Sequence, residues 1–265
     1  MKIINFILTL IVILSIVSCD EINNKPAEEG KISIIGALHT GEEKQFIQIC
    51  KISDLSEKKK FDSLFLRDAD VTLIGDDFEE PMIFTIQSQP YLRDIFYYEN
   101  KTSLKARLIA GKTYRLRVRY DNKTVNGLTT IPGKFEITSH KNNDTITTNE
   151  KVRLSWSKSP GAYMYIVNYG SAITILYNGQ EIGYPGVGYQ IATQDTFLDI
   201  SKFPYLKQEY VQYPILSQWG YATVIALDKN YYDHAYLKRD RAGLDAGYGC
   251  FSSGNVDTIK FIFKN

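Results

Sequence analysis

From Tyr114 to Tyr120 the chain alternates between apolar and charged side chains at every position. Successive side chains of a β-strand point to opposite faces of the sheet, so this period of two predicts a strand over residues 113–120. One face of it should contact a core, and the other should place Arg115, Arg117 and Arg119 in water. Asp121-Asn122 then predicts a turn into a second strand over 124–130, which closes a hairpin. A row of arginines can also bind anions, although such rows more often solvate a sheet face.

The residue composition favours strands over helices throughout the chain. It contains 19 tyrosines and 13 phenylalanines, which together with threonine, isoleucine and valine are enriched in strands. The best helix candidate spans residues 230–241. The glycine-rich stretch 179–188 is predicted to be a loop or bulge, because Pro185 interrupts it. Further strands are predicted over residues 31–36, 45–52, 70–74, 81–86, 151–157, 163–169, 196–200, 218–227 and 258–263.

A domain boundary is expected where Ile131-Pro132-Gly133 precedes a polar stretch over 139–150. The following strand ends in Trp156, and a short turn leads to the tyrosine-rich strand 163–169. This order resembles the opening of a fibronectin-type or immunoglobulin-like sandwich, in which Trp156 is a core residue. We therefore predict an all-β protein with two β-sandwich domains, over 31–135 and 136–265, the second carrying a short helix.

The N-terminus has the layout of an export signal. Lys2 precedes an apolar run from Ile3 to Val17, and Ser18 stands before Cys19. The run is too short for a membrane span, which needs about 20 residues. Residues 1–18 are therefore predicted to be a signal peptide. An ordinary secretory signal with an incidental cysteine remains the alternative.

The segment Ile16-Val17-Ser18-Cys19 also resembles a bacterial lipobox. The resemblance implies that Cys19 is acylated, with palmitate-type chains, and becomes the first mature residue. Two or more such chains anchor a protein stably in the bilayer. Residues 19–30 are polar, contain Pro26 and show no periodicity, so we expect a flexible tether between the lipid and the fold.

The distribution of charges and the number of cysteines limit which partners and covalent links are expected. The 31 basic and 30 acidic residues are interspersed, whereas a nucleic-acid site needs a concentrated basic face. Nucleic acid is therefore not an expected partner. Apart from Cys19, only Cys50 and Cys250 remain, and either one disulfide or two separate buried thiols fits that pair.

Side chains that carry catalysis are sparse. His39, His140 and His234 are the only histidines, and none lies at metal-ligand spacing. Asp233 precedes His234, so a Ser-His-Asp arrangement stays open, although no Gly-x-Ser-x-Gly motif accompanies it. We therefore predict no enzyme, no cofactor and no metal, and a hydrolase is disfavoured.

The paired carboxylates also do not predict a metal site or a catalytic site. Asp68 and Asp70 share one face of a strand and offer ligands for calcium, yet a polar strand edge is favoured because no third carboxylate follows at a regular offset. The pairs Asp76-Asp77 and Glu79-Glu80 flank a turn and are expected to be solvated rather than catalytic.

Tyrosines in loops are the candidate binding residues. Loops on a rigid β-sandwich commonly carry recognition, and the stretch from Tyr205 to Tyr213 lies between Pro204 and Pro214. Coplanar exposed rings would favour binding of a glycan, whereas scattered or inward rings would favour a protein partner or a structural role. The candidates are Tyr184, Tyr189, Tyr205, Tyr210 and Tyr213.

Three motifs carry a family resemblance: Asp68 to Leu73, residues 111–118 running into 129–132, and Ala242 to Phe251. With the lipobox they look like an uncharacterised family of outer-membrane lipoproteins from Bacteroidetes-type bacteria, often encoded beside TonB-dependent transporters. The first domain resembles transthyretin-like or carboxypeptidase-regulatory modules. Cys250 departs from the pattern, and roughly residues 170–220 match nothing.

This resemblance implies a cellular location and a genomic neighbourhood, but it implies no reaction and no catalytic residues. It implies a protein anchored by lipid in the outer membrane, on either its periplasmic or its surface face. Its expected role is binding, or assistance to a β-barrel transporter.

Overall fold

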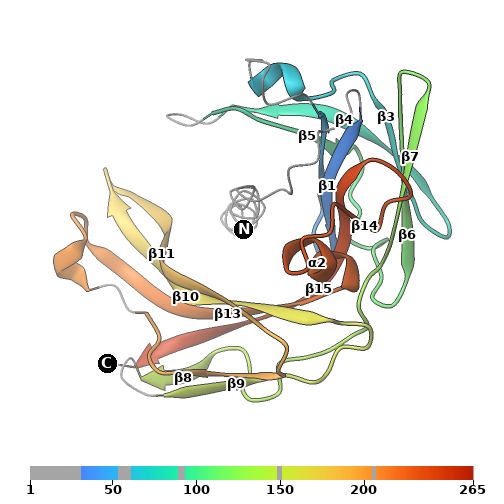
Figure 1. Ribbon diagram of the computed structural model, residues 1–265. Coiled ribbons are helices and arrows are strands. Elements are labelled where there is room, and N and C mark those ends of the chain that lie inside the picture. Colours follow the sequence, from blue (N-terminus) through green and yellow to red (C-terminus); the bar gives the residue numbers. More distant parts are fainter. Residues whose placement is uncertain (1–30, 53–60, 89–92, 148–150, 205–206, 265) are drawn as a thin grey trace.

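The computed structural model describes residues 31–52, 61–88, 93–147, 151–204 and 207–264, which form a mostly β protein with a single short α-helix among them (Figure 1). The predicted signal peptide and tether lie outside these residues. No helix in the described ranges is long and apolar enough to cross a membrane. The strands of the first half are β1 (Ile32–His39), β2 (Phe46–Lys51), β3 (Asp70–Ile74), β4 (Glu79–Gln87), β5 (Ile95–Asn100), β6 (Thr113–Tyr120) and β7 (Lys123–Thr130).

The second half contains longer strands and the helix. Its elements are β8 (Asp144–Thr147), β9 (Val152–Ser155), β10 (Met164–Tyr177), β11 (Gln180–Thr193), β12 (Phe197–Ile200), β13 (Ile215–Leu227), α2 (Lys229–Ala235), β14 (Arg241–Ala242) and β15 (Tyr248–Lys264). Two short 3-10 helices, η1 (Phe61–Leu64) and η2 (Gln208–Tyr210), lie in loops. The main sheet runs in the order β11-β10-β13-β15-β1-β2-β5-β4-β3-β6-β7, and β9 pairs with β12 in a separate sheet.

The predicted hairpin is confirmed as β6–β7. Asp121 and Asn122 have φ of 47° and 59°, the left-handed conformation that a tight two-residue turn requires. Alternate side chains of β6 are buried in the first core, and Arg115 and Arg119 are exposed. Arg117 pairs with Glu79 at 3.3 Å and Arg119 with Asp70 at 3.7 Å, so neighbouring strands supply carboxylates to two of the three arginines.

The C-terminal half packs the main sheet against the β9–β12 pair. Trp156 is buried there, with its ring edge-on to Tyr165 at a centroid distance of 5.4 Å. The prediction that Trp156 is a core residue is confirmed. The predicted class, a mostly β protein with sandwich-like sheets, is confirmed as well.

Strand β15 joins the two halves. Its first part pairs in parallel with β1, from Ser33↔Tyr248 to His39↔Gly254, and its later part pairs antiparallel with β13. Phe251 therefore belongs to the first core and Phe261 to the second. The predicted boundary between residues 135 and 136 stays a prediction, but one strand contributes to both cores.

Polar contacts reinforce this junction. Asp228, the N-cap of α2, is buried and accepts hydrogen bonds from Thr129 of β7 at 2.6 Å and from the Tyr231 amide at 3.0 Å. Ser253 of β15 also donates to the same carboxylate, at 3.4 Å. Burial raises the pKa of Asp228 to about 6, despite the hydrogen bonds that act in the opposite direction.

One sequence prediction is wrong, and another holds only in part. The helix over 230–241 ends at Ala235, because Lys238 adopts a φ of 52° and Arg241 pairs with Gly249 of β15. In the stretch 179–188, predicted to be a loop or bulge, Gly179 lies in a turn, but residues 180–188 form strand because they pair along β10. The bulge expected there is present as a register irregularity opposite Gly170 and Ala172.

Candidate functional site

An apolar cluster lies at the hairpin where β10 ends and β11 begins. We call it the tip cluster: Leu176, Tyr177, Tyr210, Tyr213 and Leu216. Tyr177 and Tyr213 meet edge to face, with centroids 5.0 Å apart and planes at 86°. The Leu176 amide donates to the Pro214 carbonyl at 3.0 Å, which fixes the loop to the hairpin. All but Tyr213 are exposed, and Tyr210 is 72% exposed.

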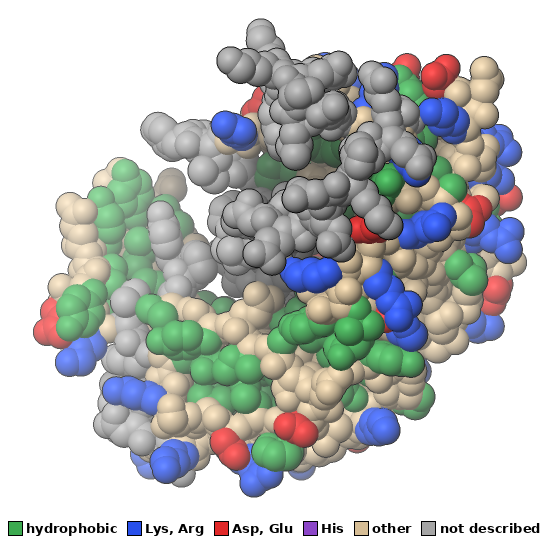
Figure 2. Space-filling model, viewed as in Figure 1, with side chains coloured by type: hydrophobic (Ala, Val, Ile, Leu, Met, Phe, Trp, Pro, Cys, Tyr) green, Lys and Arg blue, Asp and Glu red, His purple; other side chains and the backbone are tan. Residues whose placement is uncertain are grey.

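The tip cluster follows from local sequence. Asn178 and Gly179 take left-handed φ values of 49° and 77° and turn the chain between β10 and β11. In Figure 1 this hairpin and the neighbouring η2 segment extend together from the body of the protein. Figure 2 shows hydrophobic side chains over the same arm. Sequence reasoning missed Leu176, Tyr177 and Leu216, although Asn178-Gly179 is a strong hairpin signal.

The structure describes the side chains of three of the five tyrosines predicted to bind. Tyr210 and Tyr213 belong to the tip cluster. Tyr189 lies on β11 and tilts over the buried Tyr169, with centroids 5.5 Å apart and planes at 33°. Tyr184 also lies on β11, but its side chain is outside the described set, and Tyr205 is outside the described residues. The described candidates therefore lie in two places, at the hairpin tip and on the later part of β11.

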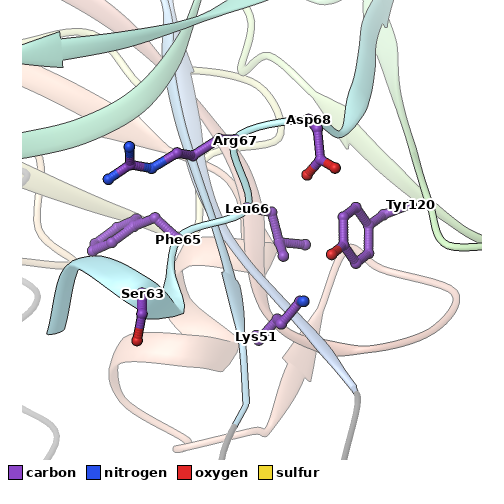
Figure 3. Close-up of a pocket in the computed structure, with 7 residues that line it drawn as sticks. All are labelled: Lys51, Ser63, Phe65, Leu66, Arg67, Asp68 and Tyr120. Atoms are coloured by element: carbon purple, nitrogen blue, oxygen red, sulfur yellow. The ribbon is translucent and has the colours of Figure 1, made fainter. Parts of the chain in front are cut away.

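A surface pocket lies on the N-terminal half, beside β2 and the end of β6. Its volume is about 460 Å³, and charges of both signs line it together with aromatic rings. In Figure 3 Lys51 and Asp68 lie on the side of Tyr120, and Arg67 extends toward the side of Phe65. The Lys51 ammonium lies 4.9 Å from the centroid of the Tyr120 ring. The lining residues are Lys51, Ser63, Phe65, Leu66, Arg67, Asp68 and Tyr120.

The charges of this pocket are already engaged by the protein. The Arg67 guanidinium lies 5.9 Å from the Phe84 centroid and 5.6 Å from that of Phe96, within the range of cation–π attraction. Asp68 stands on the same side as Lys51, so charges of both signs lie near Tyr120.

The candidate catalytic groups lie apart. Asp233 is buried and pairs with Lys229 and with Arg239, the latter at 3.2 Å. The neighbouring His234 ring nitrogen instead lies 3.2 Å from the Arg239 carbonyl oxygen. The described residues thus contain no hydrogen bond between His234 and Asp233 of the kind a catalytic triad uses.

The carboxylates near the turn have structural partners. Asp76 pairs with Lys112 at 2.9 Å. Glu80 is buried, which corrects the expectation that it is solvated, and it accepts hydrogen bonds from the amide and hydroxyl of Thr102. Burial would raise the pKa of Glu80, but these hydrogen bonds lower it overall. Among the described residues no group of three or more His, Cys, Asp or Glu can hold a metal ion.

The two cysteines do not form the disulfide that was one of two alternatives. Cys50 on β2 pairs with Ser33, and Cys250 on β15 pairs with Ile35, so β1 lies between them. Two strand spacings amount to about 10 Å, beyond the roughly 7 Å that a disulfide allows between Cα atoms. Both thiols are free, and burial raises the pKa of each to about 12.

Comparison with solved structures returns proteins built from immunoglobulin and fibronectin domains. DIP-gamma IG1+IG2 is 10% identical, with a TM-score of 0.20, over 84% of this chain and 97% of that one. The mouse nectin-like molecule 4 ectodomain is 8% identical, with a TM-score of 0.21, over 89% of this chain and 66% of that one. The chicken CNTN1 FN1-FN3 domains are 9% identical, with a TM-score of 0.22, over 89% and 69%.

All three TM-scores lie below 0.5. No curated protein matches the chain. One family model does match, over residues 19–241, and its description is "Domain of unknown function (DUF4249)". The match spans most of the chain and starts at Cys19, so the protein belongs to the DUF4249 family.

Proposed function

We propose that this protein is anchored by a lipid on Cys19 in the outer membrane and serves as a binding or accessory partner of a TonB-dependent transporter. The contact would be made by the tip cluster. No reaction is assigned to the chain.

The observation that carries this proposal is the exposure of the tip cluster. Leu176, Tyr177, Tyr210 and Leu216 present apolar and aromatic surface at the end of an extended arm. Contiguous apolar patches on a protein surface mark interaction sites, and tyrosine is enriched where interfaces carry most binding energy. A transporter in the same membrane is a partner that such an arm can reach from an anchored fold.

The described ring geometry favours a protein partner over a glycan. Sugar-binding platforms present flat, accessible rings, whereas the planes of Tyr177 and Tyr213 stand at 86° and cover one another edge to face. Tyr189 lies on a different stretch of β11 and packs on Tyr169. Membrane anchoring is supported by the lipobox-like segment and by the family match, which begins at Cys19.

The test is a pull-down of the full-length, C-terminally tagged protein from mildly solubilised outer membranes. We expect a near-stoichiometric β-barrel transporter, identified by mass spectrometry. Tyr210→Glu should reduce its recovery at least tenfold, because it places a charge at the most exposed aromatic residue of the tip cluster.

Leu128→Lys is the matched control, since Leu128 is also an exposed apolar residue but lies on β7. Recovery of the lipoprotein alone would refute the accessory role. Equal loss of the transporter in both variants would refute the assignment of the contact to the tip cluster.

A further inference from the structure

The main sheet ends in β7 on one side and in β11 on the other, and only the outer edge of β7 is covered by another described segment. At one end, the segment 243–245 covers the edge of β7: the Leu128 amide donates to the Gly243 carbonyl at 2.7 Å, and the Asp245 amide to the Asn126 carbonyl at 2.9 Å. At the other end, β11 pairs with β10 on one side, and none of the described strands pairs with its second side. Open edges of this kind present unpaired backbone groups to other chains.

Residues 187–193 of β11 lack the side chains that usually protect an edge, and the bulge of β11 lies at the start of this stretch. The stretch reads Val-Gly-Tyr-Gln-Ile-Ala-Thr and contains no charge and no proline. Natural edge strands are commonly protected by lysine, proline or a covering segment, and Pro185 interrupts only the preceding part. The side chains of Val187, Tyr189 and Ile191 share one face and are 38%, 54% and 36% exposed.

We propose that two copies of this chain associate through residues 187–193, paired antiparallel about a two-fold axis at Gln190. In that register Tyr189 lies opposite Ile191 of the partner subunit, and Ile191 opposite Tyr189 of the partner subunit. Gly188 lies opposite Ala192 of the partner subunit, and Val187 opposite Thr193 of the partner subunit.

The sequence of this stretch is complementary to itself. Aromatic residues opposite β-branched ones are favourable cross-strand pairs, each contributing about 0.2–1 kcal/mol, and the symmetric register makes the Tyr–Ile pair twice. The small pair of Gly188 and Ala192 occupies the other face without crowding. Because the stretch is uncharged, no like charges oppose each other. A second copy therefore fits this edge by chemistry already present in the chain, in the self-complementary manner of two-fold interfaces.

The proposal is independent of the transporter contact, because the tip cluster and residues 187–193 occupy separate parts of the arm. The first experiment is oxidative cross-linking of the full-length protein in detergent. Gln190→Cys places two thiols opposite each other across the axis, at a Cα separation of about 4.5–5.5 Å that permits a disulfide. We expect a covalent dimer that reverts to monomer on reduction.

Gln180→Cys is the matched control, at the hairpin end of the same strand and also exposed. In the proposed register its two copies are tens of ångströms apart, so it should not cross-link above the level of the parent protein. Cross-linking of both variants to the same extent would overturn the proposed register.

The second experiment is sedimentation of the protein without any introduced cysteine. The parent protein should show a concentration-dependent dimer, and Tyr189→Lys combined with Ile191→Lys should weaken it at least tenfold with circular dichroism unchanged. Leu128→Lys should leave it unchanged. A parent protein that is monomeric at all concentrations overturns the proposal. Co-purification of a barrel protein that is lost in the double variant would, with a monomeric parent, assign this edge to that partner instead.

Discussion

The hydroxyl of Thr129 donates a 2.6 Å hydrogen bond to the carboxylate of Asp228, 99 residues away along the chain. Both side chains are buried. The contact joins β7 of the first half to the start of α2 in the second, and it is part of the junction that β15 completes.

Removal of this hydrogen bond should destabilise the fold. Thr129→Val keeps the shape of the side chain but leaves a buried carboxylate short of a donor, which costs about 1–3 kcal/mol. Urea unfolding at neutral pH should show that decrease in the free energy of unfolding. Thr124→Val, at an exposed position of the same strand, should change it by less than about 0.5 kcal/mol.

Asp228 should also make stability depend on pH. Its folded-state pKa of about 6 lies above the ordinary value of 3.8, so the folded state binds the proton more tightly than the unfolded state. The free energy of unfolding therefore falls as pH rises from about 4 to about 6, by about 3 kcal/mol, and then levels off.

Asp228→Asn isolates this effect, because asparagine also caps a helix but does not ionise. The stability of the variant minus that of the parent should increase between pH 4 and pH 7, as measured by urea unfolding at each pH. Parallel pH profiles for the two proteins would contradict the raised pKa of Asp228.

Gly249 should be among the least replaceable residues of the closing motif. Its φ is 100°, and a Cβ atom there would lie 2.0 Å from the Ile34 carbonyl oxygen. Gly249→Ala must therefore displace β1 from β15, and we expect a loss of more than 3 kcal/mol or failure to fold, by analogy with the about 1–2 kcal/mol that a left-handed residue costs without any clash.

Gly179→Ala separates the clash from the conformational strain. Gly179 has a φ of 77°, but a Cβ atom added there would meet nothing within 4 Å, so the substitution should cost only the strain of about 1–2 kcal/mol. Chemical denaturation of both variants gives the comparison, and equal losses would show that the contact with Ile34 is relaxed at little cost.

The free thiols should be slow to react in the folded protein. Burial raises the pKa of both Cys50 and Cys250 to about 12, and the thiolate is the reactive form. At pH 8, iodoacetamide should label each of them at least tenfold more slowly in the folded protein than after unfolding in denaturant without a reductant. Site-resolved mass spectrometry checks this, and absence of label after unfolding would indicate a disulfide.

Loss of the lipid site should release the protein from the membrane. Cys19→Ala removes the only side chain proposed to carry acyl chains, which contribute about 0.8 kcal/mol per buried methylene. We expect the variant in the soluble fraction after salt and carbonate washing, with the parent protein retained. Equal retention of both would contradict lipid anchoring through Cys19.

Local periodicity predicts the parts of the fold whose two faces differ. The β6–β7 hairpin follows from the alternation of apolar and charged residues in 113–120 and from the turn residues Asp121-Asn122. This alternation arises because one face of that sheet is buried and the other is exposed to solvent. Strand β3 is predicted over residues 70–74, the bounds that the structure has.

Pairing between strands that are distant in sequence determines the elements that the local sequence pattern does not predict. Strand β11 contains glycine and proline and alternates poorly, yet β10 provides a partner along its length. Strand β15 is predicted only over 258–263, because Ser252, Ser253 and Asn255 resemble a loop until β1 and β13 pair with them. The helix pattern beyond Ala235 is overridden by the pairing of β14 with β15.

The candidate site is predicted in part for the same reason. Tyr210 and Tyr213 follow from a proline-bounded aromatic loop, but Leu176 and Tyr177 reach them only through the β10–β11 hairpin. That hairpin depends on a strand which the sequence pattern conceals.

The position of β15 has a consequence for the order in which this protein can fold. The strand that fills the first core with Phe251 and pairs with β1 follows all other described strands along the chain. Contacts so distant along the chain form late, because a long loop must close before they are gained. The N-terminal half therefore cannot complete its core until β15 has been made.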